Sequence, residues 1–240
     1  MKGVGDSIGE YVYLGIENGL NGYVDPKVHR NDSILLQINV DGASPYNSST
    51  KQLWAILCKV LFNPNIYSPF TVALYYGDTK PGNVDEYMND FIEEINLLQK
   101  NGIVVDKKKY TVQLLHIICD IPARKFLKQI KGHGRYAACE RCEVNGTRVG
   151  YPNQRVVYPD YDCHPRTDQS FREQRQKEHH LNMSPLLHIQ PPIDLIYSFP
   201  IDYMHMCCLG IIKKFYVMDL LFNKTAVRLK SSLKKNYLNE

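Results

Sequence analysis

One apolar stretch, from Ile34 to Val40, constrains the fold of this chain more than any other feature. Five of its seven residues are apolar, and three of these are β-branched. Such a run predicts a buried β-strand. It ends directly in Asp41 and Gly42, so the predicted strand presents a carboxylate at its end.

A second stretch, from Tyr110 to Cys119, has the same form and runs into Asp120, with Pro122 ending the strand. Two buried strands that each end in an aspartate are suited to hold a divalent metal, because Mg²⁺ prefers carboxylate oxygens as ligands. The alternative is that each aspartate is an ordinary turn residue after its strand.

The residues between these two stretches predict the rest of a sheet. Gln52–Phe62 and Phe70–Tyr76 are predicted strands, and a helix capped by Asn83 is predicted to end at Asn101–Gly102. A second helix is predicted from Pro122 to Ile130. The order of three strands, a helix, a strand and a helix indicates an α/β fold of the ribonuclease H-like type, in which helices flank a mixed sheet.

Four segments follow from these patterns. Residues 1–33 are expected to be an N-terminal appendage, and residues 34–130 the first part of the core. Residues 131–200 have weak periodicity and many Pro, Gly, Tyr and charged residues. This segment is too long for an ordinary loop, so we expect an irregular inserted module. Residues 201–240 predict a helix, to about residue 222, and a basic tail that frays.

The insertion contains Cys139 and Cys142 in a C-x-x-C motif. Because no helix pattern follows the first cysteine, the motif indicates half of a zinc site that staples the insertion, rather than a redox pair. His205 is the favoured third ligand, since it would tie the two ends of the insertion together. Its alternative is a partly buried histidine on an amphipathic helix. The other candidate ligands are His133, Cys163, His164, His179, His180, Cys207 and Cys208.

The charge of the chain permits nucleic-acid binding without requiring it. There are 29 Lys and Arg against 25 Asp and Glu, and the net charge is +4. Residues 213–240 hold seven Lys and Arg against two acids. The alternative for each basic cluster is ordinary solvated surface. The candidate DNA contacts are Lys107, Lys108, Lys109, Arg124, Lys128, Lys131 and Arg135.

The cysteine count and the apolar runs bear on location. Seven cysteines, two of them adjacent, fit poorly with a disulfide framework. No apolar run has the length of a signal peptide core or of a membrane span. We therefore expect a nuclear or cytoplasmic protein that is not secreted and has no membrane partner.

Many short motifs, in order, resemble the transposase-like proteins abundant in invertebrate genomes, which are related to the CACTA (En/Spm) class of cut-and-paste transposases. The resemblance covers roughly residues 9–222. The motifs include Asn39–Gly42, Tyr76–Tyr87, Cys119–Arg124, Cys139–Cys142, Arg166–Phe171, Ser184–Leu186 and Phe199–His205.

The resemblance implies a DDE/DDD catalytic domain of ribonuclease H-like fold. Asp41 and Asp120 match its first two acids, which bind Mg²⁺ or Mn²⁺. The family's C-x-x-C matches Cys139 and Cys142, and its D-x-x-H matches Asp202 and His205. The implied activity is metal-dependent hydrolysis and strand transfer on DNA, by a homo-oligomer that holds the DNA ends.

The chain departs from the family at the third acid, which lies in a helix after the insertion. Asp202, Asp219 and Glu240 are the candidates, and none has a matching context. No N-terminal zinc finger precedes the core. The sequence therefore predicts a fragment truncated at its C-terminus, or a degenerate or domesticated copy, with little or no strand transfer on its own. The alternatives are a non-catalytic nucleic-acid- or protein-binding module that keeps the fold, and an unrelated metal-dependent nuclease.

Overall fold

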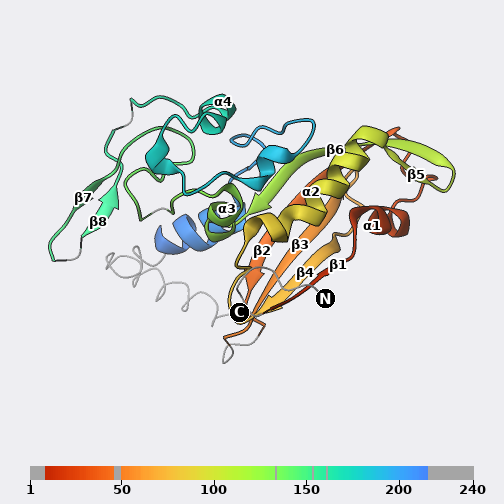
Figure 1. Ribbon diagram of the computed structural model, residues 1–240, viewed down its shortest axis with the longest axis horizontal. Helices are drawn as coiled ribbons and strands as arrows, with labels where there is room; N and C mark the ends of the chain where they lie inside the picture. Colours follow the sequence, from red (N-terminus) through yellow and green to blue (C-terminus); the bar gives the residue numbers. More distant parts are fainter. Residues whose placement is uncertain (1–8, 46–49, 133, 153, 161, 216–240) are drawn as a thin grey trace, which may run out of the picture. The chain divides into compact units, whose positions relative to one another are not determined.

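A six-stranded mixed sheet, in the order β1-β4-β3-β2-β6-β5, forms the centre of the computed structural model (Figure 1). β1 pairs with β4, β4 with β3, β3 with β2 and β5 with β6, all antiparallel, whereas β2 and β6 are parallel. The α/β fold class predicted from the sequence is confirmed at this level. The strands are β1 (Gly9–Tyr13), β2 (Ser33–Ala43), β3 (Gln52–Leu61), β4 (Phe70–Gly77), β5 (Ile103–Val105) and β6 (Lys108–Cys119).

The structure describes residues 9–45, 50–132, 134–152, 154–160 and 162–215. The chain divides into two units, Met1–Pro200 and Ile201–Glu240. The sheet belongs to the first unit.

One face of the sheet packs into the hydrophobic core. Ile34, Leu36, Ile38 and Val40 on β2 have no exposed surface, and the residues between them are half-buried. This alternation is the period of two that a strand imposes on its side chains. It explains why the apolar stretch predicted the strand correctly.

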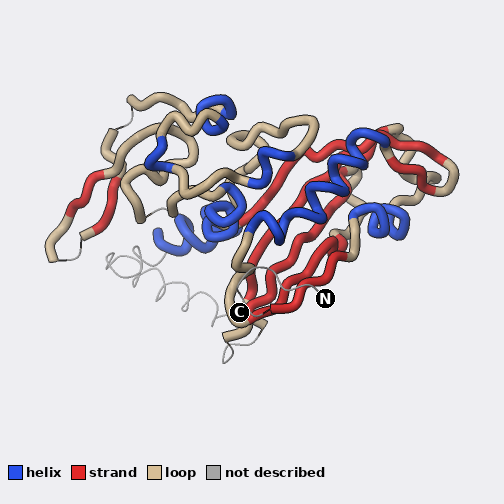
Figure 2. The backbone as a smooth tube through the Cα atoms, in the orientation of Figure 1, coloured by secondary structure: helices blue, strands red, loops and turns tan. Residues whose placement is uncertain are grey.

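The helix α2 (Val84–Asn101) follows β4, precedes the β5–β6 hairpin and lies along the sheet (Figure 2). Seven apolar or aromatic side chains at helical spacing are buried along it. The Asn83 side chain caps the helix by accepting hydrogen bonds from the backbone N–H groups of Asp85 and Glu86. Gly102 ends it with a φ of 73°, where a Cβ would lie 2.3 Å from the Tyr110 carbonyl oxygen. The predicted helix is confirmed with its cap and its stop.

The N-terminal segment differs from the expected appendage. β1 forms the edge of the main sheet, paired with β4 from Gly9 opposite Gly77 to Tyr13 opposite Ala73. The helix α1 (Ile16–Tyr23) follows and buries Ile16 and Leu20 in the core. Such a short edge strand, with Tyr11 its only buried residue, gives too weak an alternation to predict.

The described part of residues 131–200 contains only short elements, as expected. They are the hairpin of β7 (Thr147–Val149) and β8 (Arg155–Val157), the helix α4 (Asp168–Arg172), and two 3-10 turns at Lys177–His179 and Pro185–His188. The segment nevertheless packs on the core, which includes Phe171, Leu186, Leu195 and Phe199. The helix α3 (Ile121–Lys128), between β6 and this segment, confirms the second predicted helix.

The second unit begins with a helix from Tyr203 to Ile212. The Asp202 side chain caps it by accepting from the backbone N–H groups of Met204 and His205. The expected continuation to residue 222 and the basic tail lie largely outside the described residues. No helix in the described part of the chain is long and apolar enough to cross a membrane.

Candidate functional site

The register of β2 and β6 brings Asp41 and Asp120 together. Val40 lies beside Cys119 in this parallel pair; Asp41 is the next residue of β2, whereas Asp120 follows the last residue of β6 and is the N-cap of α3. Val40 and Cys119 are both fully buried. Because successive side chains of a strand alternate between the faces of a sheet, Asp41 leaves the face opposite Val40. Asp120 begins the turn into α3 at the same end of the sheet. The two predicted acids therefore lie at the same end of the sheet, after neighbouring strand residues.

Asp120 also has a structural role. Its Oδ1 accepts a hydrogen bond from the Ala123 N–H at 2.8 Å and so caps α3. The cap fixes the carboxylate at the junction between strand and helix. Asp41 is held in a similar local way, because its Oδ1 accepts from the Gly42 N–H at 2.8 Å. Both carboxylates are only partly buried, so solvent and a ligand can reach them.

Gly42 allows β3 to approach the end of β2. A Cβ on Gly42 would lie 2.6 Å from the indole of Trp54, which sits opposite it in the sheet. Trp54 in turn packs edge-on against the Phe126 ring of α3, with 5.4 Å between centroids. The glycine of the Asp-Gly pair thus allows the packing that positions α3 next to the two acids.

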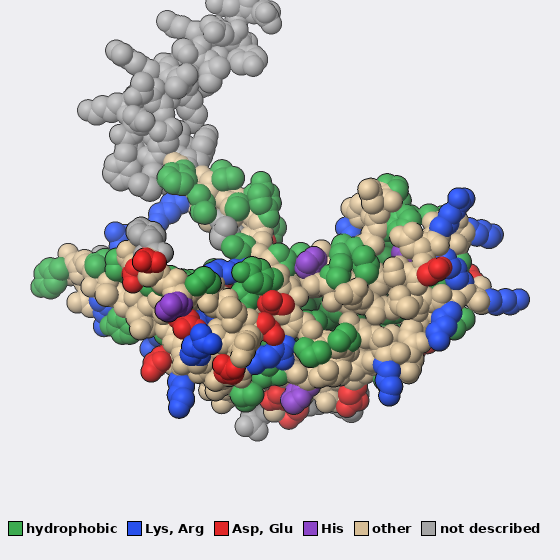
Figure 3. Space-filling view, turned by 90° about the horizontal axis from the view of Figure 1, so that it is seen from above, with side chains coloured by type: hydrophobic (Ala, Val, Ile, Leu, Met, Phe, Trp, Pro, Cys, Tyr) green, Lys and Arg blue, Asp and Glu red, His purple; other side chains and the backbone are tan. Residues whose placement is uncertain are grey.

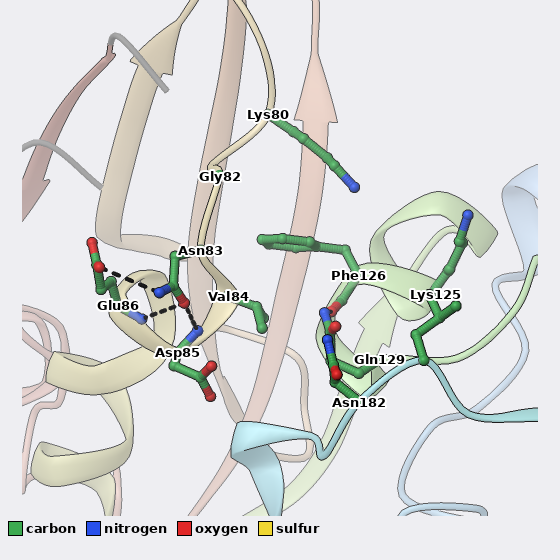
Figure 4. Close-up of a pocket in the computed structure, with 11 residues that line it drawn as sticks. Lys80, Gly82, Asn83, Val84, Asp85, Glu86, Lys125, Phe126, Gln129 and Asn182 are labelled. Carbon is green, nitrogen blue, oxygen red and sulfur yellow. Dashed lines mark hydrogen bonds between the residues drawn. The ribbon is translucent and has the colours of Figure 1, made fainter. Parts of the chain in front are cut away.

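A pocket of about 610 Å³ opens beside this packing, between the loop before α2 and the helix α3 (Figure 4). Lys80 reaches across it, with its Nζ 4.9 Å from the Phe126 ring centroid. Burial, and to a smaller extent Lys125, lowers the pKa of Lys80. Asp85 and Glu86 also line the pocket, so its charges balance and do not favour an anionic ligand.

A third acid does not join Asp41 and Asp120 within the described residues. Asp202 belongs to the second unit, where it caps the helix and its Oδ2 lies 2.8 Å from His205 Nδ1. Asp219 and Glu240 lie outside the described residues. In the described ranges, no three His, Cys, Asp or Glu side chains are grouped so that they could hold a metal ion.

The C-x-x-C motif forms a tight turn whose Cys139 and Cys142 sulfur atoms are 3.2 Å apart. Burial raises the pKa of the Cys139 thiol. The buried Arg166 guanidinium donates from Nη2 to the backbone carbonyls of both cysteines, at 3.3 and 3.0 Å. These hydrogen bonds fix the backbone of the turn.

The remaining zinc ligands stay predictions. The backbone of Cys142 forms an isolated antiparallel β-bridge with Pro165. Cys163 and His164 therefore lie on a segment that runs next to the motif. His205 belongs to the second unit, and His133 lies outside the described residues.

Zinc analysis of the purified wild type should give about one ion per chain, lost in a Cys139→Ser/Cys142→Ser variant. A folded, metal-free wild type would reject the site.

Two of the predicted DNA contacts, Arg124 and Lys128, are wrong. Lys128 is 1% exposed and Arg124 is 7% exposed. Both point into the interior, where they form ion pairs with Glu140 at 3.1 and 3.2 Å. They are four residues apart, on one face of α3, and that face is the buried one. Neither side chain reaches a DNA phosphate.

The lysines at the β5–β6 hairpin lie far from the acids. Lys108 is occupied locally, because its Nζ donates to the backbone carbonyls of His29, Arg30 and Asn31. Lys107 and Lys109 are exposed. β6 rises about 3.3 Å per residue, so these lysines are roughly 35 Å from Asp120, at the other end of the sheet.

Lys131 and Arg135 are the predicted contacts that line a pocket, in the insertion. On the face drawn in Figure 3, the Lys and Arg side chains of the described residues are dispersed among other types and form no single basic patch. Sequence reasoning missed Tyr136 and Arg148, which line the same pocket. The only signal in the sequence is that Tyr136 ends the basic, glycine-containing stretch 131–136.

No protein-family model matches the chain, and a comparison with curated proteins finds no significant match. The case for a function therefore depends on the geometry of these residues.

Proposed function

We propose that Asp41 and Asp120 are two metal-binding acids of a ribonuclease H-like phosphoryl-transfer core, related to that of DDE-type DNA transposases. The observation that carries this proposal is the parallel register of β2 and β6. In this register β2 and β6 end side by side, so that the two aspartates follow the paired residues Val40 and Cys119 at one end of the sheet.

The connectivity of the sheet supports the proposal. β2, β3 and β4 form an antiparallel meander, and the chain returns through α2 to place β6 parallel to β2. The strand at the start of the meander and the strand after the helix thus become neighbours in the middle of the sheet. This is the arrangement in which a ribonuclease H-like domain presents its first two acids.

The donor set fits a hard divalent cation, because both groups offer carboxylate oxygens. A bound Mg²⁺ or Mn²⁺ would supply Lewis-acid stabilisation for attack on a DNA phosphodiester. Asp41 and Asp120 would hold and orient it, and the α3 cap would keep Asp120 fixed. A pair of cations needs more carboxylates than these two. We therefore expect this chain alone to bind the metal weakly and not to catalyse strand transfer.

A plasmid-nicking assay tests the catalytic part of the proposal. Supercoiled DNA incubated with the purified chain and Mg²⁺ should stay supercoiled, as it does with an Asp41→Ala variant. Nicking by the wild type that disappears in Asp41→Ala would show that the two acids suffice and that the expected inactivity is wrong. Nicking that persists in Asp41→Ala would point to a contaminating nuclease.

One observation also favours a non-catalytic, nucleic-acid-binding role. The insertion presents a pocket with three cations and an aromatic side chain, whereas the acidic site has no third carboxylate among the described residues. A protein that keeps the fold and binds DNA without cleaving it is consistent with both features. DNA binding in EDTA, together with no nicking in Mg²⁺, would identify this role.

A further inference from the structure

The insertion contains a pocket of about 480 Å³ that is separate from the two acids. Its volume lies in the range of small-ligand sites. Its charged lining residues are mostly basic, in contrast to the pocket beside α3, where the charges balance. The lining residues are Lys131, Gly134, Arg135, Tyr136, Ala137, Asn145, Arg148 and Glu178.

The charges in this pocket favour an anion. Lys131, Arg135 and Arg148 face a single carboxylate, that of Glu178. Within the described ranges, none of these three cations forms an ion pair. Arg124 and Lys128, by contrast, are neutralised by Glu140 in the interior. The pocket thus gathers positive charge that the protein itself leaves uncompensated.

Tyr136 gives the pocket an aromatic surface. Its side chain is 48% exposed, and the Arg148 guanidinium lies 5.6 Å from the centroid of its ring. A large aromatic residue this exposed, next to a cation, buries little surface in the folded chain. An arginine and an aromatic ring side by side form a platform on which an unpaired base can stack.

The backbone beneath these side chains is fixed. The Gly146 N–H donates to the Tyr136 carbonyl at 2.6 Å, and the Tyr158 hydroxyl donates to the Arg135 carbonyl at 2.6 Å. The Lys131 N–H donates to the His179 carbonyl at 2.8 Å. The platform is therefore positioned in advance, which reduces the entropy lost when a ligand binds.

We propose that this pocket binds a segment of single-stranded DNA, with one base stacked on Tyr136 and the adjacent phosphates at Lys131, Arg135 and Arg148. A duplex would offer only its backbone, because its bases are already stacked, and the tyrosine would contribute little. The choice of DNA rests on the proposed function. α3 starts at the Asp120 cap and ends at Lys128, a length of about 12 Å, so a strand held at the acids can extend to this pocket.

Binding of a fluorescein-labelled single-stranded oligonucleotide, measured by anisotropy in EDTA, tests the proposal. Tyr136→Ala should weaken binding about 5- to 100-fold, the usual range for losing one stacked base. Tyr136→Phe should bind like the wild type, because stacking does not need the hydroxyl. Tyr151→Ala is the matched control, since Tyr151 is 95% exposed and does not line the pocket. The Tyr151→Ala variant should bind the oligonucleotide with the affinity of the wild type.

The phosphate contacts have their own readout. In an Arg135→Gln/Arg148→Gln variant, the slope of log affinity against log salt should become shallower by about 1.4, since each single-strand phosphate contact contributes about 0.7. A Lys27→Gln/Lys100→Gln variant, at exposed positions that do not line the pocket, should keep the wild-type slope. Duplex DNA of the same length should bind more weakly than the single strand, and its affinity should not depend on Tyr136.

The outcomes separate this proposal from the proposed function. Wild-type binding that is equally strong in Tyr136→Ala, or lost instead in Lys107→Gln/Lys109→Gln, would overturn the pocket assignment and leave the phosphoryl-transfer core untouched. A wild type that binds neither single-stranded nor duplex DNA would overturn the pocket proposal, whereas the metal site at the two acids fails only if it binds no Mn²⁺. A preference for the duplex that is independent of Tyr136 would also reject the single-strand site.

Discussion

Replacing Glu140 by glutamine should lower the free energy of unfolding by about 3–5 kcal/mol, the usual cost of removing one partner from a buried ion pair. The Glu140 carboxylate accepts from Arg124 Nε at 3.1 Å and from Lys128 Nζ at 3.2 Å. The Lys128 ammonium also lies 5.2 Å from the ring centroids of Phe171 and Phe199. Without Glu140, two cations would remain in the interior with no compensating charge.

Chemical denaturation followed by circular dichroism measures this effect. Glu173→Gln is the matched control, because Glu173 is half exposed and its ion pair with Arg175, at 3.8 Å, lies on the surface. It should change stability by less than about 0.5 kcal/mol. Adding Lys128→Met to Glu140→Gln should restore part of the loss by removing one of the stranded charges. A Glu140→Gln protein within 1 kcal/mol of the wild type would show that the insertion is not anchored on α3 through these pairs.

Acidification should destabilise the protein well before its carboxylates titrate. Burial, and then the nearby Arg166, lowers the pKa of His179 to about 3 and that of His180 to about 4. In the unfolded chain both pKa values return to about 6.5. Below pH 6.5 the unfolded state therefore binds more protons than the folded state, and stability falls as the pH falls.

The size of the effect follows from the two shifts. Each histidine contributes up to about 1.4 kcal/mol per pH unit, so the pair should lower the free energy of unfolding by up to about 4 kcal/mol between pH 6.5 and pH 5. Urea denaturation across this range measures the slope. His180→Gln should reduce the slope by about half, whereas His188→Gln, at an exposed position, should leave it unchanged. A flat profile from pH 6.5 to 5 in the wild type would mean that the two histidines take up protons as readily in the folded state as in the unfolded chain, so that their pKa values are not lowered.

The central elements were predictable because their patterns are long and their ends are marked. The β2 stretch alternates over a whole strand, α2 has both a cap and a glycine stop, and each acid follows its strand directly. The meeting of Asp41 and Asp120 followed from the order of elements, since a helix between two strands of one sheet allows them to run parallel. The ribonuclease H-like assignment itself stays a proposal.

The basic residues show where the sequence was insufficient. Arg124, Lys125 and Lys128 look alike in a count of charges, yet the helical period turns Arg124 and Lys128 inward and leaves Lys125 exposed. The partner that makes the burial of the two inward cations tolerable, Glu140, lies in a segment with no regular pattern.

The pocket around Tyr136 was hidden for a related reason. Its walls come from the loop after α3 and from the β7 hairpin, and hydrogen bonds such as that between Gly146 and Tyr136 join them. Contacts of this kind, between irregular segments, leave no periodic signal in the sequence. Residues 9–15 read as a short strand-like run, but five residues with one buried side chain give no signal for the pairing of β1 with β4.

The most direct test of a metal site shared by Asp41 and Asp120 is a Mn²⁺ titration followed by amide NMR of the chain. In the wild type, Mn²⁺ should broaden the signals of residues next to both acids together. Asp41→Asn should abolish the broadening at both strand ends, and so should Asp120→Asn, in which asparagine still caps α3. Broadening around one aspartate that survives removal of the other, or none at either position in the wild type, would contradict a shared site.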